Sequence, residues 1–242
     1  MGMSDLLTAI RSRGHWHVVV RPAAFVEKRL PVEERLDMSV LYGLVEQAGV
    51  QLRGWAFPHL DRHNPLVIDL DWVGQNNDWE HRRESWRLYQ SGQFVDVCGF
   101  WDDWRDRSSW WPPNKGWQPG RRLGIGDTLF RLTEIFEFAA RLSMSPAGDE
   151  SMHVEVAVKN LSGRVLFVDT PNRLPIHREP KATINEFQFA IYLARAELVS
   201  SARDQALRAA IELFKRFGWN GSLELLRGWQ SELGRRRDGA GT

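Results

Sequence analysis

The stretch from Trp72 to Trp117 constrains the fold of this chain more than any other part, because it concentrates very large aromatic side chains. It holds eight of the twelve tryptophans in the 242-residue sequence. Tryptophan joins a broad apolar ring to a single N–H donor, so it packs well at the margin of a core or in an interface, and it is enriched at binding hot spots. Leaving so large an apolar side chain in water forfeits about 1.5–3 kcal/mol. The stretch must therefore pack against the body of the protein or be covered by a partner.

The composition is that of a folded protein, with 43% hydrophobic and 26% charged residues. Lys and Arg number 32 and Asp and Glu 31, so no overall excess of charge drives binding to nucleic acid or to an anionic membrane. Cys98 is the only cysteine, which excludes an intrachain disulfide and fits a reducing compartment. The first residues lack the layout of a signal peptide, and no stretch approaches the roughly 20 apolar residues of a membrane span. We therefore expect a cytoplasmic protein with no membrane association.

Several segments have the periodicity of amphipathic helices. Apolar residues recur every fourth position between Leu36 and Ala48, and Gly49 marks the end of that helix. The most apolar helix follows Asp127 as its expected N-cap and carries only a narrow polar stripe, so we expect it to be deeply packed. The expected helices cover residues 5–13, 31–48, 128–144, 207–217 and 222–233.

Other segments combine β-branched and aromatic residues between turn residues, which predicts strands. The clearest is a hairpin over residues 86–97 with a two-residue Ser91-Gly92 turn. Its predicted cross-strand pairs are Trp86–Val97, Arg87–Asp96, Leu88–Val95 and Tyr89–Phe94. A second hairpin is expected over residues 153–169. Single strands are expected over residues 15–22, 50–57, 66–73 and 184–193.

Strands that occur in hairpins, without strict alternation with helices, favour an α+β fold. We expect an antiparallel or mixed sheet built from hairpins and covered by amphipathic helices. One domain is expected over residues 1–242, and a subdivision, if the chain has one, would fall near residues 145–151.

The loop from Trp101 to Trp117 is the expected contact surface. It combines tryptophan, proline, glycine and charge without any periodicity, and long loops in compact domains are often functional. The alternative is that the loop is purely structural and its indole rings are packing mass. The residues expected to bind a partner are Trp104, Arg105, Arg107, Trp110 and Trp111.

A second hypothesis is a metal-dependent phosphoesterase or nuclease. Histidine and carboxylate side chains can hold a metal ion, and two such ions can activate water for phosphoester hydrolysis. The spacing matches no known metal motif, so the competing interpretation is ordinary solvated or ion-paired groups. The candidate ligands are His59, Asp61, His63, Asp69 and Asp71.

Two further patterns are weak. Gly124 and Gly126 precede a helix whose N-terminus could bind an anion, with Arg121 and Arg122 next to them. The last two predicted helices have the size of a helix-turn-helix with a basic end. No motif identifies a reaction or a cofactor. We therefore expect a non-enzymatic interaction or regulatory module without a cofactor, whose partner is a protein or a second copy, with nucleic acid as an alternative.

Overall fold

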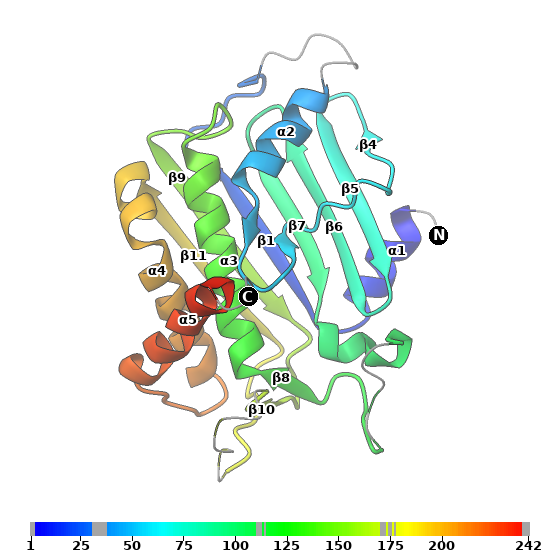
Figure 1. Cartoon of the computed structure of the whole chain (residues 1–242), viewed down its shortest axis with the longest axis vertical. Coiled ribbons are helices and arrows are strands. Elements are labelled where there is room, and N and C mark those ends of the chain that lie inside the picture. The colour runs from blue at the N-terminus through cyan, green and yellow to red at the C-terminus, as the bar shows by residue number, and fades with distance from the viewer. Residues whose placement is uncertain are drawn as a thin grey trace.

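A seven-stranded antiparallel sheet organises the molecule, in the order β11-β9-β1-β7-β6-β5-β4 (Figure 1). The computed structural model describes residues 3–30, 38–109, 113, 115–169, 173, 176 and 178–238, with side chains except at 3, 4, 38 and 233–238. The strands of the sheet are β1 (His15–Pro22), β4 (Val67–Ile68), β5 (Trp72–Trp79), β6 (Arg82–Tyr89), β7 (Phe94–Gly99), β9 (Ser151–Lys159) and β11 (Glu186–Ala194). The expected α+β class with an antiparallel sheet is therefore confirmed. Strands from both sides of residues 145–151 belong to this one sheet.

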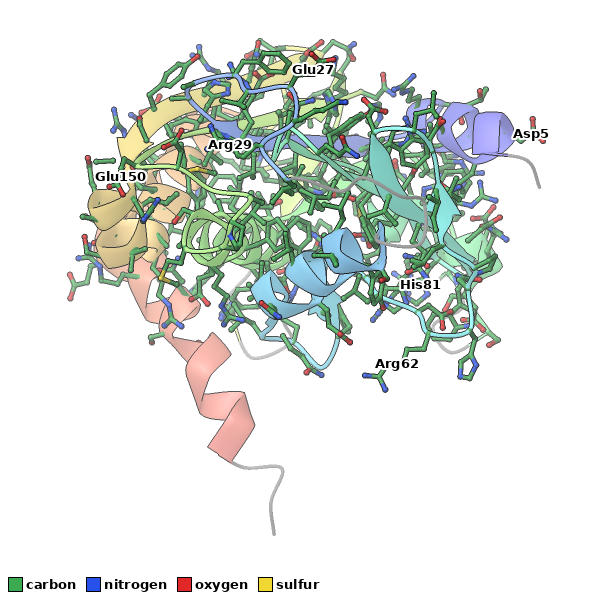
Figure 2. The ribbon with its side chains drawn as sticks, turned by 90° about the horizontal axis from the view of Figure 1, so that it is seen from above. Asp5, Glu27, Arg29, Arg62, His81 and Glu150 are labelled. Atoms are coloured by element: carbon green, nitrogen blue, oxygen red, sulfur yellow. The ribbon has the colours of Figure 1, made fainter. Side chains whose placement is uncertain are left out.

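Helices lie on both faces of the sheet. The helices are α1 (Met3–Arg11), α2 (Met38–Ala48), α3 (Ile125–Ser143), α4 (Arg195–Lys215) and α5 (Leu223–Asp238), with a 3₁₀ helix η2 (Trp101–Arg107). Figures 1 and 2 show α2, α3, α4 and α5 on one face, called here the inner face, and α1 on the other. Two small sheets pair β2 (Val50–Gln51) with β3 (Ala56–Phe57), and β8 (Arg122–Gly124) with β10 (Val165–Phe167). The second hairpin expected over residues 153–169 is therefore wrong, because β9 pairs with β1 and β11 while β10 pairs with β8.

The core lies between the inner face and α3. Strand register places Trp16, Val18 and Val20 of β1 on this face, where all three are at most 1% exposed. Helix α3 is buried along most of its length, as its apolar sequence predicts. On the outer face, Leu6 and Ile10 of α1 form a small separate cluster with Val97.

The expected hairpin pairs β6 with β7, but the predicted register is wrong by one residue. The turn is a three-residue loop in which Gly92 adopts φ +83°, and the Tyr89 N–H donates to the Gln93 carbonyl at 2.9 Å. This is the bulged form of a short hairpin, and a one-residue slip moves every side chain to the opposite face. Asp96 therefore lies opposite Trp86 and is buried on the inner face, and it does not pair with Arg87.

Two single strands of the sequence prediction are interrupted. Residues 66–73 form two strands separated by a turn, closed by the Asp69 N–H donating to the Trp72 carbonyl at 3.0 Å. This turn leaves Leu70 92% exposed, although simple alternation would have buried it. Residues 50–57 form the small β2–β3 pair around Gly54, whose φ of +88° interrupts the extended chain.

Candidate functional site

The first part of the Trp-rich loop folds back on the body of the protein. It forms η2, in which Trp104 is only 4% exposed. The guanidinium groups of Arg13 and Arg83 lie 4.0 and 4.1 Å from the centre of the Trp104 ring. The chain itself thus encloses this ring between two cations, which is favourable for an indole. Trp104 is consequently absent from the surface on which the sequence placed it.

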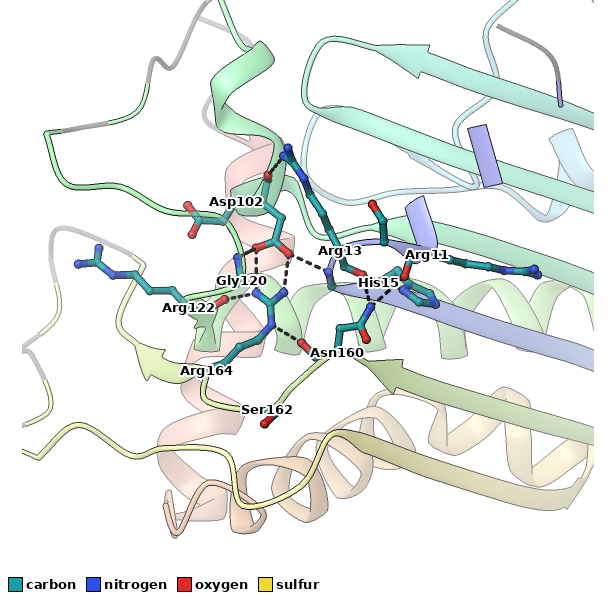
Figure 3. Close-up of polar contacts among 12 residues, drawn as sticks. Arg11, Arg13, His15, Asp102, Gly120, Arg122, Asn160, Ser162 and Arg164 are labelled. Atoms are coloured by element: carbon teal, nitrogen blue, oxygen red, sulfur yellow. Dashed lines mark hydrogen bonds and ion pairs between the residues drawn. The ribbon is translucent and has the colours of Figure 1, made fainter. Parts of the chain in front are cut away.

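A buried ion pair between Asp103 and Arg164 holds η2 in place, and both side chains are 1% exposed. The Asp103 carboxylate accepts hydrogen bonds from the Gly14 and Gly120 backbone N–H groups, at 2.8 and 2.9 Å, and from Nη1 of Arg164 at 2.8 Å. Arg164 also donates to the backbone carbonyls of Asn160 and Arg122, at 2.6 and 2.9 Å (Figure 3). We call this arrangement the Asp103–Arg164 clamp.

The clamp joins segments that are far apart in the sequence. The side-chain amide of Asn160 donates to the Arg11 and Arg13 carbonyls, which ties the β9–β10 turn to the end of α1 (Figure 3). A side chain at Gly14 would collide with Arg164, since its Cβ would lie 2.2 Å from Nη2. The clamp lines one side of an open depression of about 410 Å³. Because the clamp groups bond each other so fully, we assign the clamp a structural role.

The other expected partner-binding residues lie at the far end of η2. Arg105 and Arg107 are ion-paired, Arg105 with Asp102 at 3.5 Å and Arg107 with Asp78 at 2.5 Å. The Arg107 side chain is 35% exposed. Trp110 and Trp111 lie outside the described residues, so their place on a contact surface stays a prediction.

The candidate metal ligands occupy two separate places. His59, Asp61 and His63 belong to a loop that is fastened over β5 and β6: the His59 N–H donates to Glu84 at 3.0 Å and the Asp61 N–H to Gln75 at 3.0 Å. This loop crosses the inner face, which explains why polar side chains of the strands are buried beneath it.

Asp69 and Asp71 are exposed in the β4–β5 turn, next to the β6–β7 turn, where the Asp71 carbonyl accepts from the Gln90 N–H at 2.7 Å. Among the described residues, no three histidine, cysteine, aspartate or glutamate side chains are grouped as metal ligands. The structure therefore does not assemble the proposed set.

The N-terminus of α3 already holds an anion of the chain itself. The Asp169 carboxylate accepts from the Gly126 and Asp127 N–H groups, at 2.9 and 2.7 Å. Gly124 is the N-cap residue, so the expected capping role of Asp127 is wrong. An external phosphate would have to displace Asp169 from this position.

Sequence reasoning missed a buried carboxyl pair on the inner face. Asp96 is 0% exposed and Glu84, on the neighbouring strand, is 4% exposed. Neither Asp96 oxygen accepts a hydrogen bond from a donor group among the described residues. Burial, together with the adjacent Glu84 carboxylate, raises the pKa of Asp96 well above its ordinary value. A protonated Asp96 can donate a hydrogen bond to the adjacent Glu84 carboxylate, which explains how the two carboxyl groups can be buried together.

Arg53 makes a bidentate contact with Glu134 of α3. Its Nε and Nη2 donate to the two carboxylate oxygens at 2.8 Å each, and Glu134 is 0% exposed. Nη1 of Arg53 also contacts Asp127 at 2.5 Å. Burial opposes the charge of Arg53, but these carboxylates outweigh it and raise its pKa. This cation compensates buried carboxylates and fastens the β2–β3 segment to α3.

Arg82 lies near the surface between two indole rings. Its guanidinium lies 3.9 Å from the centre of the Trp55 ring and 5.8 Å from that of Trp79. No carboxylate in the described part of the chain lies within ion-pair distance of Arg82. Burial and the nearby Arg131 guanidinium lower its pKa, and the Glu84 carboxylate offsets them only in part. Trp79 is 49% exposed.

We call Trp55, Trp79 and Arg82 the Trp79–Arg82 surface. It adjoins η2, because Ser109 contacts Glu80 in the β5–β6 turn and the His81 ring lies 6.2 Å from that of Trp101. Alternation on β6 places Arg82, Glu84 and Trp86 on one face, but no sequence pattern indicates that the Arg82 end of this face reaches the surface.

The comparisons with known proteins add no relative. No helix in the described part of the chain has the length and apolar character needed to cross a membrane. No protein-family model matches this sequence, and neither a curated protein nor a solved structure is significantly similar to it.

Proposed function

We propose that this protein is a non-enzymatic interaction module that binds an acidic segment of a partner protein at the Trp79–Arg82 surface. The observation that carries the proposal is the half-exposed Trp79 ring beside Arg82, a cation with no carboxylate within ion-pair distance among the described residues. Tryptophan and arginine are the residues most enriched at the energetic centres of interfaces. Trp110 and Trp111, which lie outside the described residues, are proposed to contact the same partner.

The charge of Arg82 favours an acidic partner over a neutral one. Arg105 and Arg107 on the adjoining η2 already have aspartate partners, so they contribute mainly to the polar rim. Arg82 instead has its face against Trp55, and the edge of a guanidinium presents N–H donors that match a carboxylate. A glutamate or aspartate side chain of a partner would supply the ion-pair partner that Arg82 lacks among the described residues.

The burial of the carboxyl pair supports a module without catalysis. General acid–base catalysis requires a carboxyl group within hydrogen-bond reach of the substrate. Asp96 and Glu84 are 0% and 4% exposed and lie beneath the 58–64 loop and α3, so in this conformation a substrate does not reach them.

The test is fluorescence anisotropy with two probes, a short fluorescein-labelled glutamate-rich peptide and a labelled single-stranded oligonucleotide. We expect the peptide to bind, with affinity that falls as salt rises. Arg82→Glu is expected to weaken binding on the order of tenfold, about 1.4 kcal/mol. The matched control is Arg227→Glu, since the Arg227 side chain is 57% exposed on α5, which packs against α3 and α4.

Equal binding by the two variants would reject the assignment of Arg82. Stronger binding of the oligonucleotide than of the peptide would indicate that the partner is a nucleic acid and not an acidic protein, since bases also stack on indole rings.

A further inference from the structure

Strand β11 forms one edge of the main sheet. It pairs with β9 over nine consecutive residues, from Glu186 opposite Lys159 to Ala194 opposite Ser151, without a bulge. No other strand in the described part of the chain pairs with its free side, and Figure 1 shows β11 as the outermost strand beside α4. The opposite edge is the two-residue strand β4, which is too short to template another strand.

The free edge of β11 lacks the usual protection. Edge strands of monomers are commonly blunted by lysine, proline, a bulge or short length. The sequence of β11, EFQFAIYLA, contains none of these, and its only charged residue is Glu186 at its first position. A long regular edge of this composition is expected to be covered by another strand.

The strand is complementary to a second copy of itself. Antiparallel pairing about a two-fold axis at Ala190 places Phe189 opposite Ile191 of the other copy, and both of these side chains are only half-buried in the single chain. The same pairing places Glu186 beside Arg195 of the other copy, one residue beyond the end of the strand. Glu186 is exposed and Arg195 is half-buried. In their own chain Glu186 pairs with Lys159, and Arg195 pairs with Glu150 and donates to the Asp149 carbonyl at 3.2 Å, and exposed ion pairs of this kind contribute little.

We propose that β11 is the interface of a two-fold symmetric homodimer in which the sheets of two copies join through antiparallel β11 strands centred on Ala190. The interface is isologous, so each contact occurs twice. A pair of nine-residue strands is a small interface, and small interfaces give weak association. We therefore expect a dimer with a dissociation constant on the order of micromolar. This inference does not depend on the proposed acidic partner.

Cross-linking tests the axis. Residues that face each other across an antiparallel pair have Cα atoms about 4.5–5.5 Å apart, which suits a disulfide. Ala190→Cys is thus expected to form a covalent dimer under mild oxidation, seen on a non-reducing gel. The native Cys98 is buried and does not compete. The control is Ala24→Cys, because Ala24 is exposed in the loop that follows β1. Cross-linking of Ala190→Cys no faster than of the control would overturn the proposal.

Sedimentation equilibrium tests the association itself. Wild-type protein is expected to dimerise with rising concentration, and a purely monomeric protein up to about 1 mM would overturn the proposal. Ala190→Lys places like charges opposite each other and is expected to raise the dissociation constant roughly tenfold or more, whereas Ala24→Lys leaves it unchanged. Glu186→Arg and Arg195→Glu are each expected to weaken the dimer, and the double variant to restore it. A double variant as weak as either single variant would overturn the antiparallel register.

Discussion

Replacing Arg164 with alanine is predicted to be strongly destabilising, because it leaves the Asp103 carboxylate buried without its cation. Both side chains are 1% exposed, so water cannot replace the lost guanidinium. Removing one partner of a buried ion pair costs about 3–5 kcal/mol. Proteins are typically stable by about 5–15 kcal/mol, so Arg164→Ala is expected to remove a large share of the total free energy of unfolding. Urea denaturation followed by circular dichroism measures this difference from the shift in midpoint.

Two further variants make the result interpretable. Arg227→Ala removes a surface ion pair, with side chains 57% and 63% exposed, and is expected to cost about 0–1 kcal/mol. The double variant Asp103→Asn/Arg164→Met removes both charges of the clamp and is expected to recover part of the stability lost in Arg164→Ala. If Arg164→Ala costs no more than Arg227→Ala, the clamp does not hold the loop.

Three other predictions concern the buried residues Asp96, Cys98 and Arg53. The raised pKa of Asp96 means that the folded protein keeps a proton that the unfolded chain releases above pH 3.8. The free energy of unfolding should therefore fall as the pH rises from 3.8 through the raised pKa. Asp96→Asn should remove that fall in urea titrations at different pH values. Burial raises the pKa of the Cys98 thiol, so native protein should react with iodoacetamide far more slowly than unfolded protein, and equal rates would contradict the buried placement. Arg53→Ala removes the bidentate partner of buried Glu134 and leaves it Arg131 at 3.7 Å, so it should cost about 3 kcal/mol, and a loss within the range of a surface pair would contradict that role.

Much of the fold was predictable because it depends on local patterns. The apolar periodicity of α3 and the β-branched run of β1 each indicate their own structure. The register of the β6–β7 hairpin was not predictable in the same way, because a two-residue turn and a three-residue bulged turn both fit Ser91-Gly92. That single residue decided whether Asp96 faced Arg87 or the core.

The contacts that surround the candidate site were harder to predict, because they join residues far apart in the chain. Asp103 meets Arg164 across 61 positions, and Arg53 meets Glu134 across 81. Nothing near Trp104 in the sequence indicates that Arg13 and Arg83 enclose its ring. The concentration of indole rings correctly drew attention to this end of the molecule, but composition alone could not separate the packed Trp104 from the half-exposed Trp79.

The most direct test compares Trp79→Ala with Trp104→Ala in two measurements on the same protein, urea denaturation and anisotropy of the glutamate-rich peptide. Trp104 is enclosed, so its removal is predicted to cost about 3–5 kcal/mol of stability. Trp79 is 49% exposed, so its removal is predicted to leave stability nearly unchanged and to abolish peptide binding. A Trp79→Ala variant that loses stability as Trp104→Ala does, while still binding the peptide, would contradict the account.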